Sequence, residues 1–221
     1  MTKLIYIADP MCSWCYGFGP ELSALLDGLP GLRVEIVLGG LRAYNDAVMD
    51  EVMRTELMAH WQKVHDASGL AFSDQTVMQE NFIYNTEPAC RAVVAARQWA
   101  PDATMAVFQA IQQAFYVDGR DVTRAEVLAE VCSKALTAAG APIDAAGAPI
   151  DAAAFAALWE SDEIKQATHA DFAQTRHWNI TGFPTLVLER DGALDMVTSG
   201  FTAMPKLVEQ LQALVDRQTA A

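Results

Sequence analysis

Strand-like segments occur only near the two ends of this chain, and the sequence between them has helical periodicity. Residues 3–8 and 33–40 are rich in β-branched and aromatic side chains, and the segment 12–28 between them predicts a helix that ends at Gly28-Leu29-Pro30. Two strands flanking one helix form a βαβ unit, in which the strands run parallel through a right-handed crossover. The N-terminal part of the chain therefore predicts one edge of an α/β sheet.

The C-terminal part predicts the rest of that sheet. The segment 179–200 reads as two strands joined by a tight turn at Asp191-Gly192, and an amphipathic helix follows them. Between the two ends, apolar residues recur at helical spacing, and Thr123 with Glu126 matches a capping box at the start of one helix. The predicted order is βαβ, a helical block, then ββα.

This order predicts a discontinuous sheet domain, residues 1–45 and 178–221, and a helical insertion domain, residues 46–177. Within the insertion, the sequence GAPIDAA occurs twice in succession, at 140–146 and 147–153. Two copies are too few for a stacked repeat architecture. We interpret them as a duplication in an exposed connection, with Asp151 as the N-cap of the following helix.

The charge of the chain narrows the classes of partner. Fifteen Lys and Arg residues against 28 Asp and Glu residues give a formal net charge of −13, which repels phosphate backbones and anionic lipids. We therefore expect no nucleic-acid and no membrane partner. The apolar run at the N-terminus is broken by Asp9-Pro10, too early for a secretory signal, so we expect a cytoplasmic protein.

Cys12 and Cys15 are separated by two residues and follow the first predicted strand. A zinc site would need two more N or S ligands, and the remaining cysteines and histidines have no such spacing, so we predict no metal. With four cysteines in 221 residues, a disulfide framework is also disfavoured. A buried, inert thiol pair and a redox-active pair are the alternatives that remain.

The redox hypothesis has a physical basis at both positions. A thiol at the first turn of a helix faces unpaired backbone N–H groups and the positive end of the helix dipole, which favour its thiolate. Cys12 would occupy that position, and Cys15 would lie one turn later on the same helix face. Cys12 is then the nucleophile that attacks a disulfide, and Cys15 resolves the mixed disulfide.

A second candidate segment is TGFPT, in which Pro184 stands at the start of a predicted strand. A trans proline there would merely remove one ladder donor. A cis Phe183–Pro184 bond would instead turn the backbone of Phe183 toward the cysteines, where an extended substrate could pair as an added strand. From this segment alone, both conformations are open. We name Phe183, Pro184 and the predicted surface residue Trp14 as candidate substrate-binding residues.

Taken together, CSWC at the first helix and GFPT at the third strand resemble the thioredoxin superfamily. The helical insertion resembles its DsbA-like branch, and DPMCSWCYGFGPE is similar to the FrnE-like group of predicted dithiol-disulfide isomerases. The resemblance implies a thioredoxin fold with a helical insertion, redox chemistry at Cys12 and Cys15, a cis peptide bond at Pro184, and protein or peptide thiols and disulfides as partners. It implies no cofactor beyond the dithiol, with glutathione as a possible co-substrate.

Ser13 and Trp14 depart from the better-known motifs, because neither the histidine of DsbA nor the proline of thioredoxin stands between the cysteines. We therefore expect a reductase or isomerase rather than a net oxidant. One alternative is a glutathione-dependent isomerase or transferase of the kappa-class and hydroxychromene-carboxylate isomerase type, although those proteins have serine at the position of Cys12. A second is a non-catalytic binding module. Asp9 is either a proton acceptor or a turn residue, and Cys90 is predicted to be buried and inert.

Overall fold

The computed structural model describes residues 2–29, 31–141 and 149–219. Its strands are β1 (Thr2–Ala8), β2 (Arg33–Leu38), β3 (Thr185–Arg190) and β4 (Ala193–Ser199). The helices are α1 (Ser13–Gly17), α2 (Gly19–Asp27), α3 (Glu51–Ser68), α4 (Glu87–Trp99), α5 (Thr104–Tyr116), α6 (Ala125–Ala138), α7 (Ala152–Glu160), α8 (Asp162–His177) and α9 (Met204–Thr219), with a 3₁₀ turn at Pro101–Ala103.

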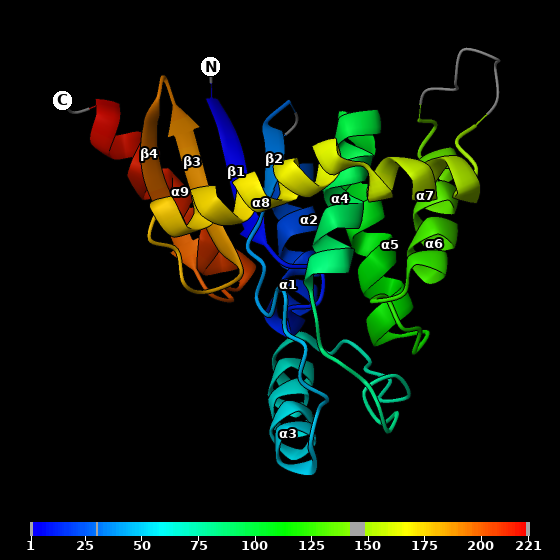
Figure 1. The fold of residues 1–221 in the computed structure, drawn as a ribbon. Coiled ribbons are helices and arrows are strands. Elements are labelled where there is room, and N and C mark those ends of the chain that lie inside the picture. Colours follow the sequence, from blue (N-terminus) through cyan, green and yellow to red (C-terminus); the bar gives the residue numbers. More distant parts are fainter. Residues whose placement is uncertain (1, 30, 142–148, 220–221) are drawn as a thin grey trace.

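The strands form one mixed sheet in the order β2-β1-β3-β4 (Figure 1). β1 and β2 are parallel, with Ala8 opposite Leu38, whereas β3 is antiparallel to both β1 and β4. The carboxyl ends of β1 and β2 therefore meet at one edge, where α1 begins. The hairpin prediction is confirmed, because Asp191 and Gly192 have φ values of 50° and 87°, as a turn with two left-handed residues requires.

Both faces of the sheet are covered. In β1, Leu4, Tyr6 and Ala8 enter the main core with α2 and α9, and that core continues into the helical block. Ile5 and Ile7 enter a smaller core on the other face, which α8 crosses in Figure 1. The uninterrupted apolar run of β1 follows from this arrangement, since a strand buried on both faces has no solvent-facing side.

The predicted helix 12–28 is two helices, and this expectation was wrong at its centre. α1 ends at Gly17 and α2 begins at Gly19, with Phe18 between them. Pro20 explains the break, because proline has no backbone N–H to donate to the carbonyl four residues earlier, and its ring collides with that carbonyl. The short first helix keeps the cysteine motif apart from the longer helix that packs on α9.

The two helix-cap predictions had opposite outcomes. Asp151 caps α7, with its carboxylate accepting from the backbone N–H of Ala154 at 2.8 Å. The capping-box prediction for Thr123 is wrong, because α6 starts at Ala125 and the hydroxyl of Thr123 donates to Asp121 at 2.6 Å. Most of the repeated GAPIDAA segment, residues 142–148, lies outside the described residues.

The outer edge of β2 is closed by side chains from the helical block. Asp171 of α8 accepts from the N–H of Leu38 at 2.9 Å, and Arg97 of α4 donates to the carbonyl of Ile36 at 2.6 Å. Arg97 and Asp171 also pair with each other through two contacts of 2.8 and 2.9 Å. Thr175 donates to the carbonyl of Leu38 at 3.2 Å. These contacts block strand pairing along this part of the edge.

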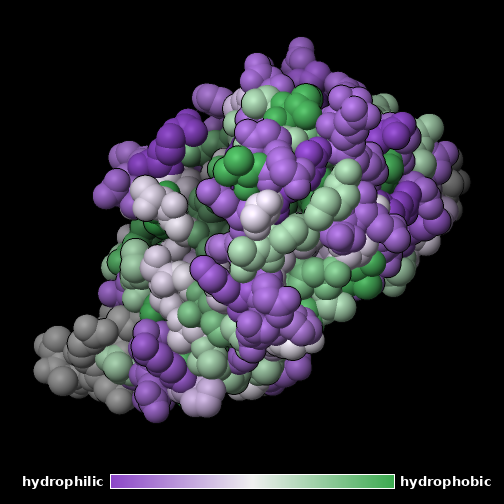
Figure 2. Space-filling model, turned by 90° about the horizontal axis from the view of Figure 1, so that it is seen from below, coloured by the Kyte–Doolittle hydropathy of each residue, from purple (hydrophilic) through white to green (hydrophobic). Residues whose placement is uncertain are grey.

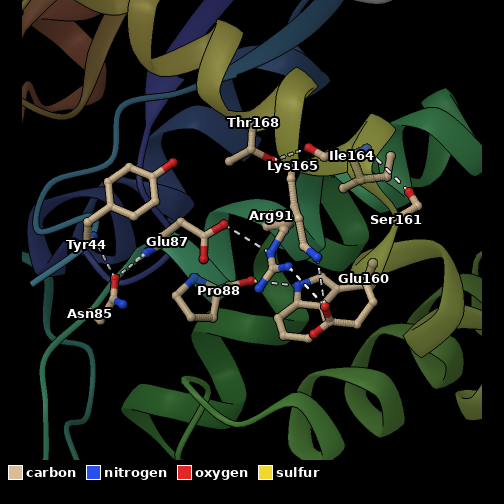
Figure 3. A network of polar contacts seen from close by, with 11 residues as sticks. Tyr44, Asn85, Glu87, Pro88, Arg91, Glu160, Ser161, Ile164, Lys165 and Thr168 are labelled. Atoms are coloured by element: carbon tan, nitrogen blue, oxygen red, sulfur yellow. Dashed lines mark hydrogen bonds and ion pairs between the residues drawn. The ribbon is translucent and has the colours of Figure 1, made fainter. Parts of the chain in front are cut away.

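A second polar network joins α4 to α7 and α8 (Figure 3). The Arg91 guanidinium lies 3.8 Å from the ring centroid of Trp159 and pairs with Glu87 one turn earlier at 3.0 Å. Glu160 reaches Arg91 at 3.7 Å and Lys165 at 3.1 Å. The guanidinium therefore joins α4 to α7 by stacking and pairing, and Glu160 carries the contact on to Lys165 of α8.

Candidate active site at the Cys12–Cys15 loop

The cysteine pair lies at the carboxyl edge of the parallel strands, at the start of α1. Cys12 is the N-cap residue with extended backbone, φ −85° and ψ 117°, so it stands one position before the first turn that the sequence predicted. Cys15 is the third residue of the helix. Functional groups in open α/β sheets commonly gather at such an edge, outside the carboxyl ends of the strands.

The two thiols differ in accessibility. Cys12 is 5% exposed and Cys15 is fully buried, and both are free thiols. Burial raises the pKa of Cys15 well above its ordinary value, and the neighbouring Cys12 raises it further. Cys15 therefore keeps its proton at neutral pH, whereas the sulfur that a solvent-borne molecule can reach is that of Cys12.

The segment around Pro184 lies beside Cys12, although 171 positions separate the two in sequence. The Cys12 thiol donates to the backbone carbonyl of Phe183 at 3.7 Å. The Phe183–Pro184 peptide bond is cis. Pro184 is buried, and the half-buried ring of Phe183 lies over Gly39, which follows β2 and has no side chain to obstruct it. The structure thus brings together Cys12, Cys15, Phe183 and Pro184.

A cleft of about 370 Å³ opens in front of Cys12. Its walls come from the cysteine loop, the loop after β2, α3, Tyr84 and Phe183; the lining residues are Cys12, Ser13, Trp14, Leu41, Arg42, Met49, Met53, Glu56, Leu57, His60, Tyr84 and Phe183. Figure 2 shows this end of the molecule, where apolar side chains lie among polar ones. The lining thus combines apolar side chains with a few polar and charged ones, as binding clefts commonly do.

Trp14 is less exposed than predicted. Its ring packs edge-on against His60 of α3 at a centroid distance of 5.8 Å, and against Phe201 at 5.6 Å. The side chain is therefore half-buried, yet it still lines the cleft. Burial, together with the positive charge of Lys63, lowers the pKa of His60 below its ordinary value. His60 is consequently neutral at pH 7.

Asp9 is fully buried and holds three segments together. One carboxylate oxygen accepts from the N–H of Met11 at 2.8 Å, and the other accepts from the N–H of Leu41 at 2.7 Å and from the thiol of Cys90 at 3.4 Å. Burial raises the pKa of Asp9, while the groups that donate to its carboxylate oppose that rise. The carboxylate thus ties the cysteine loop to the cleft wall and to α4.

No sequence pattern singled out Tyr84, yet its side chain reaches the cysteine loop. Its phenol donates to the backbone carbonyl of Met11, and its ring lies 5.4 Å from the guanidinium carbon of Arg42. Burial raises the pKa of this phenol far above its ordinary value, so that it remains a donor.

The remaining cysteines are remote from solvent. Cys90 and Cys132 are fully buried, and burial raises the pKa of both thiols. No cluster of three or more His, Cys, Asp or Glu side chains that could hold a metal ion occurs among residues 2–29, 31–141 and 149–219. In the same part of the chain, no helix is long and apolar enough to cross a membrane.

A larger open cleft of about 850 Å³ lies at the opposite end of β1 and β2. Four of its charged side chains are paired: Lys3 pairs with Glu35 at 2.5 Å and with Glu189 at 3.2 Å, and Arg97 pairs with Asp171. Its described lining residues include no cysteine or histidine. The smaller cleft at Cys12 is therefore the better candidate for chemistry.

Comparison with known proteins places this geometry in a family. Residues 4–212 match the model of the DSBA-like thioredoxin domain. A solved structure titled "putative protein disulfide isomerase", from Nitrosomonas europaea, is 34% identical, with a TM-score of 0.84 and 98% of each chain covered. The cytosolic disulfide reductase DsbM from Pseudomonas aeruginosa is 25% identical, with a TM-score of 0.73 and coverage of 99% of this chain and 100% of that one.

A 2-hydroxychromene-2-carboxylate isomerase shares the fold alone, at 15% identity and a TM-score of 0.63, with 98% of this chain and 97% of that chain covered. No curated protein matched the sequence. The family match spans both the sheet and the helical block, which agrees with the predicted thioredoxin fold carrying a helical insertion. The chain therefore belongs to the family of DSBA-like thioredoxin domains, whose thiol-disulfide oxidoreductase chemistry fits the cysteine loop described above.

Proposed function

We propose that this protein reduces or isomerises disulfides of proteins or peptides through Cys12 and Cys15. The observation that carries the proposal is the difference between the two thiols: Cys12 lines the cleft, whereas Cys15 is fully buried directly behind it. A nucleophile must be reachable by its substrate, and a resolving thiol must be held close to the mixed disulfide and away from other reagents.

The proposed reaction has two exchange steps. The Cys12 thiolate attacks one sulfur of the substrate disulfide, so that a Cys12–substrate disulfide forms and the other substrate sulfur leaves as a thiolate, which takes up a proton. Cys15 then loses its proton and attacks the Cys12 sulfur, which releases the second substrate thiol and leaves a Cys12–Cys15 disulfide. Two electrons pass to the substrate, and a dithiol or glutathione-class reductant restores the pair.

The raised pKa of Cys15 fits the order of these steps. A thiol that stays protonated does not compete with Cys12 for the incoming disulfide. Once Cys12 is bound in a mixed disulfide, its negative charge no longer disfavours ionisation of Cys15, so one of the causes of the raised pKa disappears. Resolution becomes easier at the stage at which it is needed.

Substrate binding is proposed at Trp14, Phe183 and Pro184. Trp14 and Phe183 both line the cleft beside Cys12, and the Phe183 carbonyl that Cys12 contacts offers an acceptor to an extended substrate backbone. Glutathione is a candidate co-substrate, since the reductase DsbM has also been solved with GSH. We propose a cytoplasmic location, because DsbM is a cytosolic reductase.

Insulin reduction tests the proposal. Cys12→Ser should abolish activity, and Cys15→Ser should accumulate mixed disulfides at Cys12 that mass spectrometry detects. Cys132→Ser is the matched control, because it removes a buried thiol far from the cleft and should leave activity unchanged. Full activity in Cys12→Ser would refute the proposal.

A glutathione titration distinguishes the proposed disulfide exchanger from the alternative, a glutathione-dependent isomerase or transferase. Reduced glutathione is added to the reduced protein and, separately, to the oxidised protein, and native mass spectrometry detects the covalent adducts and noncovalent complexes that form. An exchanger forms a glutathione adduct at Cys12 only from the oxidised protein. A stable noncovalent complex with the dithiol intact, without disulfide exchange, would favour the isomerase or transferase instead.

A further inference from the structure

The peptide group between Met11 and Cys12 is held from both of its edges. Its carbonyl accepts from the phenol of Tyr84, and its N–H, which belongs to Cys12, donates to the backbone carbonyl of Asp9 at 3.0 Å. The preceding N–H, that of Met11, donates to the carboxylate of Asp9 at 2.8 Å. Three hydrogen bonds therefore restrain the two peptide planes that lead into the cysteine.

Tyr84 is itself held firmly. It is 2% exposed, and its ring packs against Phe82 and Phe115, each at a centroid distance of 5.9 Å. Arg42 covers the ring from the side of the cleft. The phenol thus reaches the cysteine loop from a rigid aromatic cluster of the helical block, and its hydrogen bond crosses 73 positions of sequence.

Fixing these planes fixes the direction of the Cys12 side chain. A peptide group is planar, so the backbone at Cys12 turns only about its φ and ψ, between the planes on either side of it. The plane after Cys12 is also held, because the Cys12 carbonyl accepts from the N–H of Tyr16 at 3.0 Å. With the planes on both sides held, both angles of Cys12 are restrained. The Cα–Cβ bond then points in one direction, toward the cleft and the Phe183 carbonyl. Thiol-disulfide exchange needs the attacking sulfur aligned with the disulfide it breaks, so this direction matters for rate.

We propose that Tyr84 is a positioning residue for Cys12: its phenol, by holding the Met11 carbonyl, orients the nucleophilic sulfur for attack on a disulfide. This role rests on the function proposed above. It assigns a catalytic purpose to the helical block, beyond covering the sheet. The Tyr84 phenol does not touch the substrate; it acts through the backbone of the cysteine loop.

The test compares two tyrosines that each donate one hydrogen bond to a backbone carbonyl. Tyr84→Phe removes the bond to Met11, and Tyr16→Phe removes a bond of 3.2 Å to Ala71. For each variant, single-turnover reduction of a peptide disulfide is measured alongside alkylation by iodoacetamide across pH and the thermal unfolding midpoint. Alkylation needs a thiolate but places much weaker demands on its direction, so it separates reactivity from orientation.

We expect disulfide reduction by Tyr84→Phe to be roughly 10- to 100-fold slower than that of the wild type, the size expected for a small misplacement of a reacting group. Its limiting alkylation rate should stay within about twofold of the wild-type rate, because a thiolate remains whatever its direction. Tyr16→Phe should match the wild type in both reactions. The unfolding midpoint should fall further in Tyr84→Phe than in Tyr16→Phe, because the lost hydrogen bond is buried at Tyr84 and exposed at Tyr16.

Three outcomes overturn the inference. Disulfide reduction at the wild-type rate in Tyr84→Phe would show that the phenol does not orient Cys12. Equal slowing in both variants would indicate general loosening, and a parallel loss of alkylation would indicate an effect on thiolate formation. Failure of the proposed function looks different, because the wild-type protein itself would then fail to reduce the disulfide.

Discussion

Replacing Gly39 with alanine should disturb the cysteine site from the far side of Phe183. An added Cβ at Gly39 would lie 2.7 Å from Cε2 of the Phe183 ring and closer still to two other ring carbons. Carbon atoms do not approach so closely, so the ring must move. Overpacking of this kind lowers the free energy of unfolding by about 1–3 kcal/mol. Because the Phe183 ring is only half-buried and can move, we expect a loss in the lower part of that range, about 1–2 kcal/mol.

Urea unfolding gives the free energy, and insulin reduction gives the effect on the site. Because the Phe183 carbonyl contacts Cys12, displacement of this residue should also lower kcat/KM. Gly182→Ala, next to Phe183, is the matched control, since an added Cβ there meets no heavy atom within 4 Å. It should change stability by about 0.5 kcal/mol or less. Wild-type stability and activity in Gly39→Ala would refute the packing argument.

Three further changes probe the rest of the framework. Asp171→Ala should destabilise the protein by about 2–4 kcal/mol in urea unfolding, because the partly buried charge of Arg97 and the N–H of Leu38 both lose the Asp171 carboxylate as acceptor. A loss below 0.5 kcal/mol would contradict the role of Asp171 at the edge of β2. Asp151→Ala should cost about 1 kcal/mol through loss of the α7 cap, whereas Thr123→Ala should lack that penalty, as thermal unfolding would reveal. The folded-state pKa of Asp9 is raised, so the contribution of Asp9 to stability is fully present below its ordinary pKa of about 3.9 and is lost as pH rises through the raised pKa. Urea unfolding of the wild type and of Asp9→Asn across pH checks this. The free energy of unfolding of the wild type minus that of the variant should decrease with pH over that window, and an increase would contradict the raised pKa.

Local sequence signals predicted most of the sheet and the position of the cysteine pair. The buried run of β1, the glycine turn of the hairpin and the Asp151 cap each depend on neighbouring residues, and the structure has all three. The division into domains at residues 45 and 178 stays a prediction. The roles of Cys12, Cys15, Trp14, Phe183 and Pro184 in catalysis and binding likewise stay predictions.

Other features could not be predicted because distant residues decide them. Thr123 matched a capping box, but Asp121 competes for its hydroxyl, and pattern matching does not rank two acceptors. Trp14 was predicted to be at the surface because nothing in its own helix covers it; His60 does so from α3. Tyr84 gave no signal at all, since neither spacing nor periodicity tells where a phenol on an irregular segment points.

The long sequence separation between Cys12 and Phe183 has a consequence during synthesis. The two cysteines leave the ribosome 171 residues before the carbonyl that meets the outer one. At about 5–20 residues per second, this interval is roughly 10–35 s. Until then, the Cys12 sulfur lacks both that carbonyl contact and the cleft wall that Phe183 forms. A newly made chain therefore depends on its surroundings to protect the Cys12 thiol until the segment with Phe183 has been made and folded.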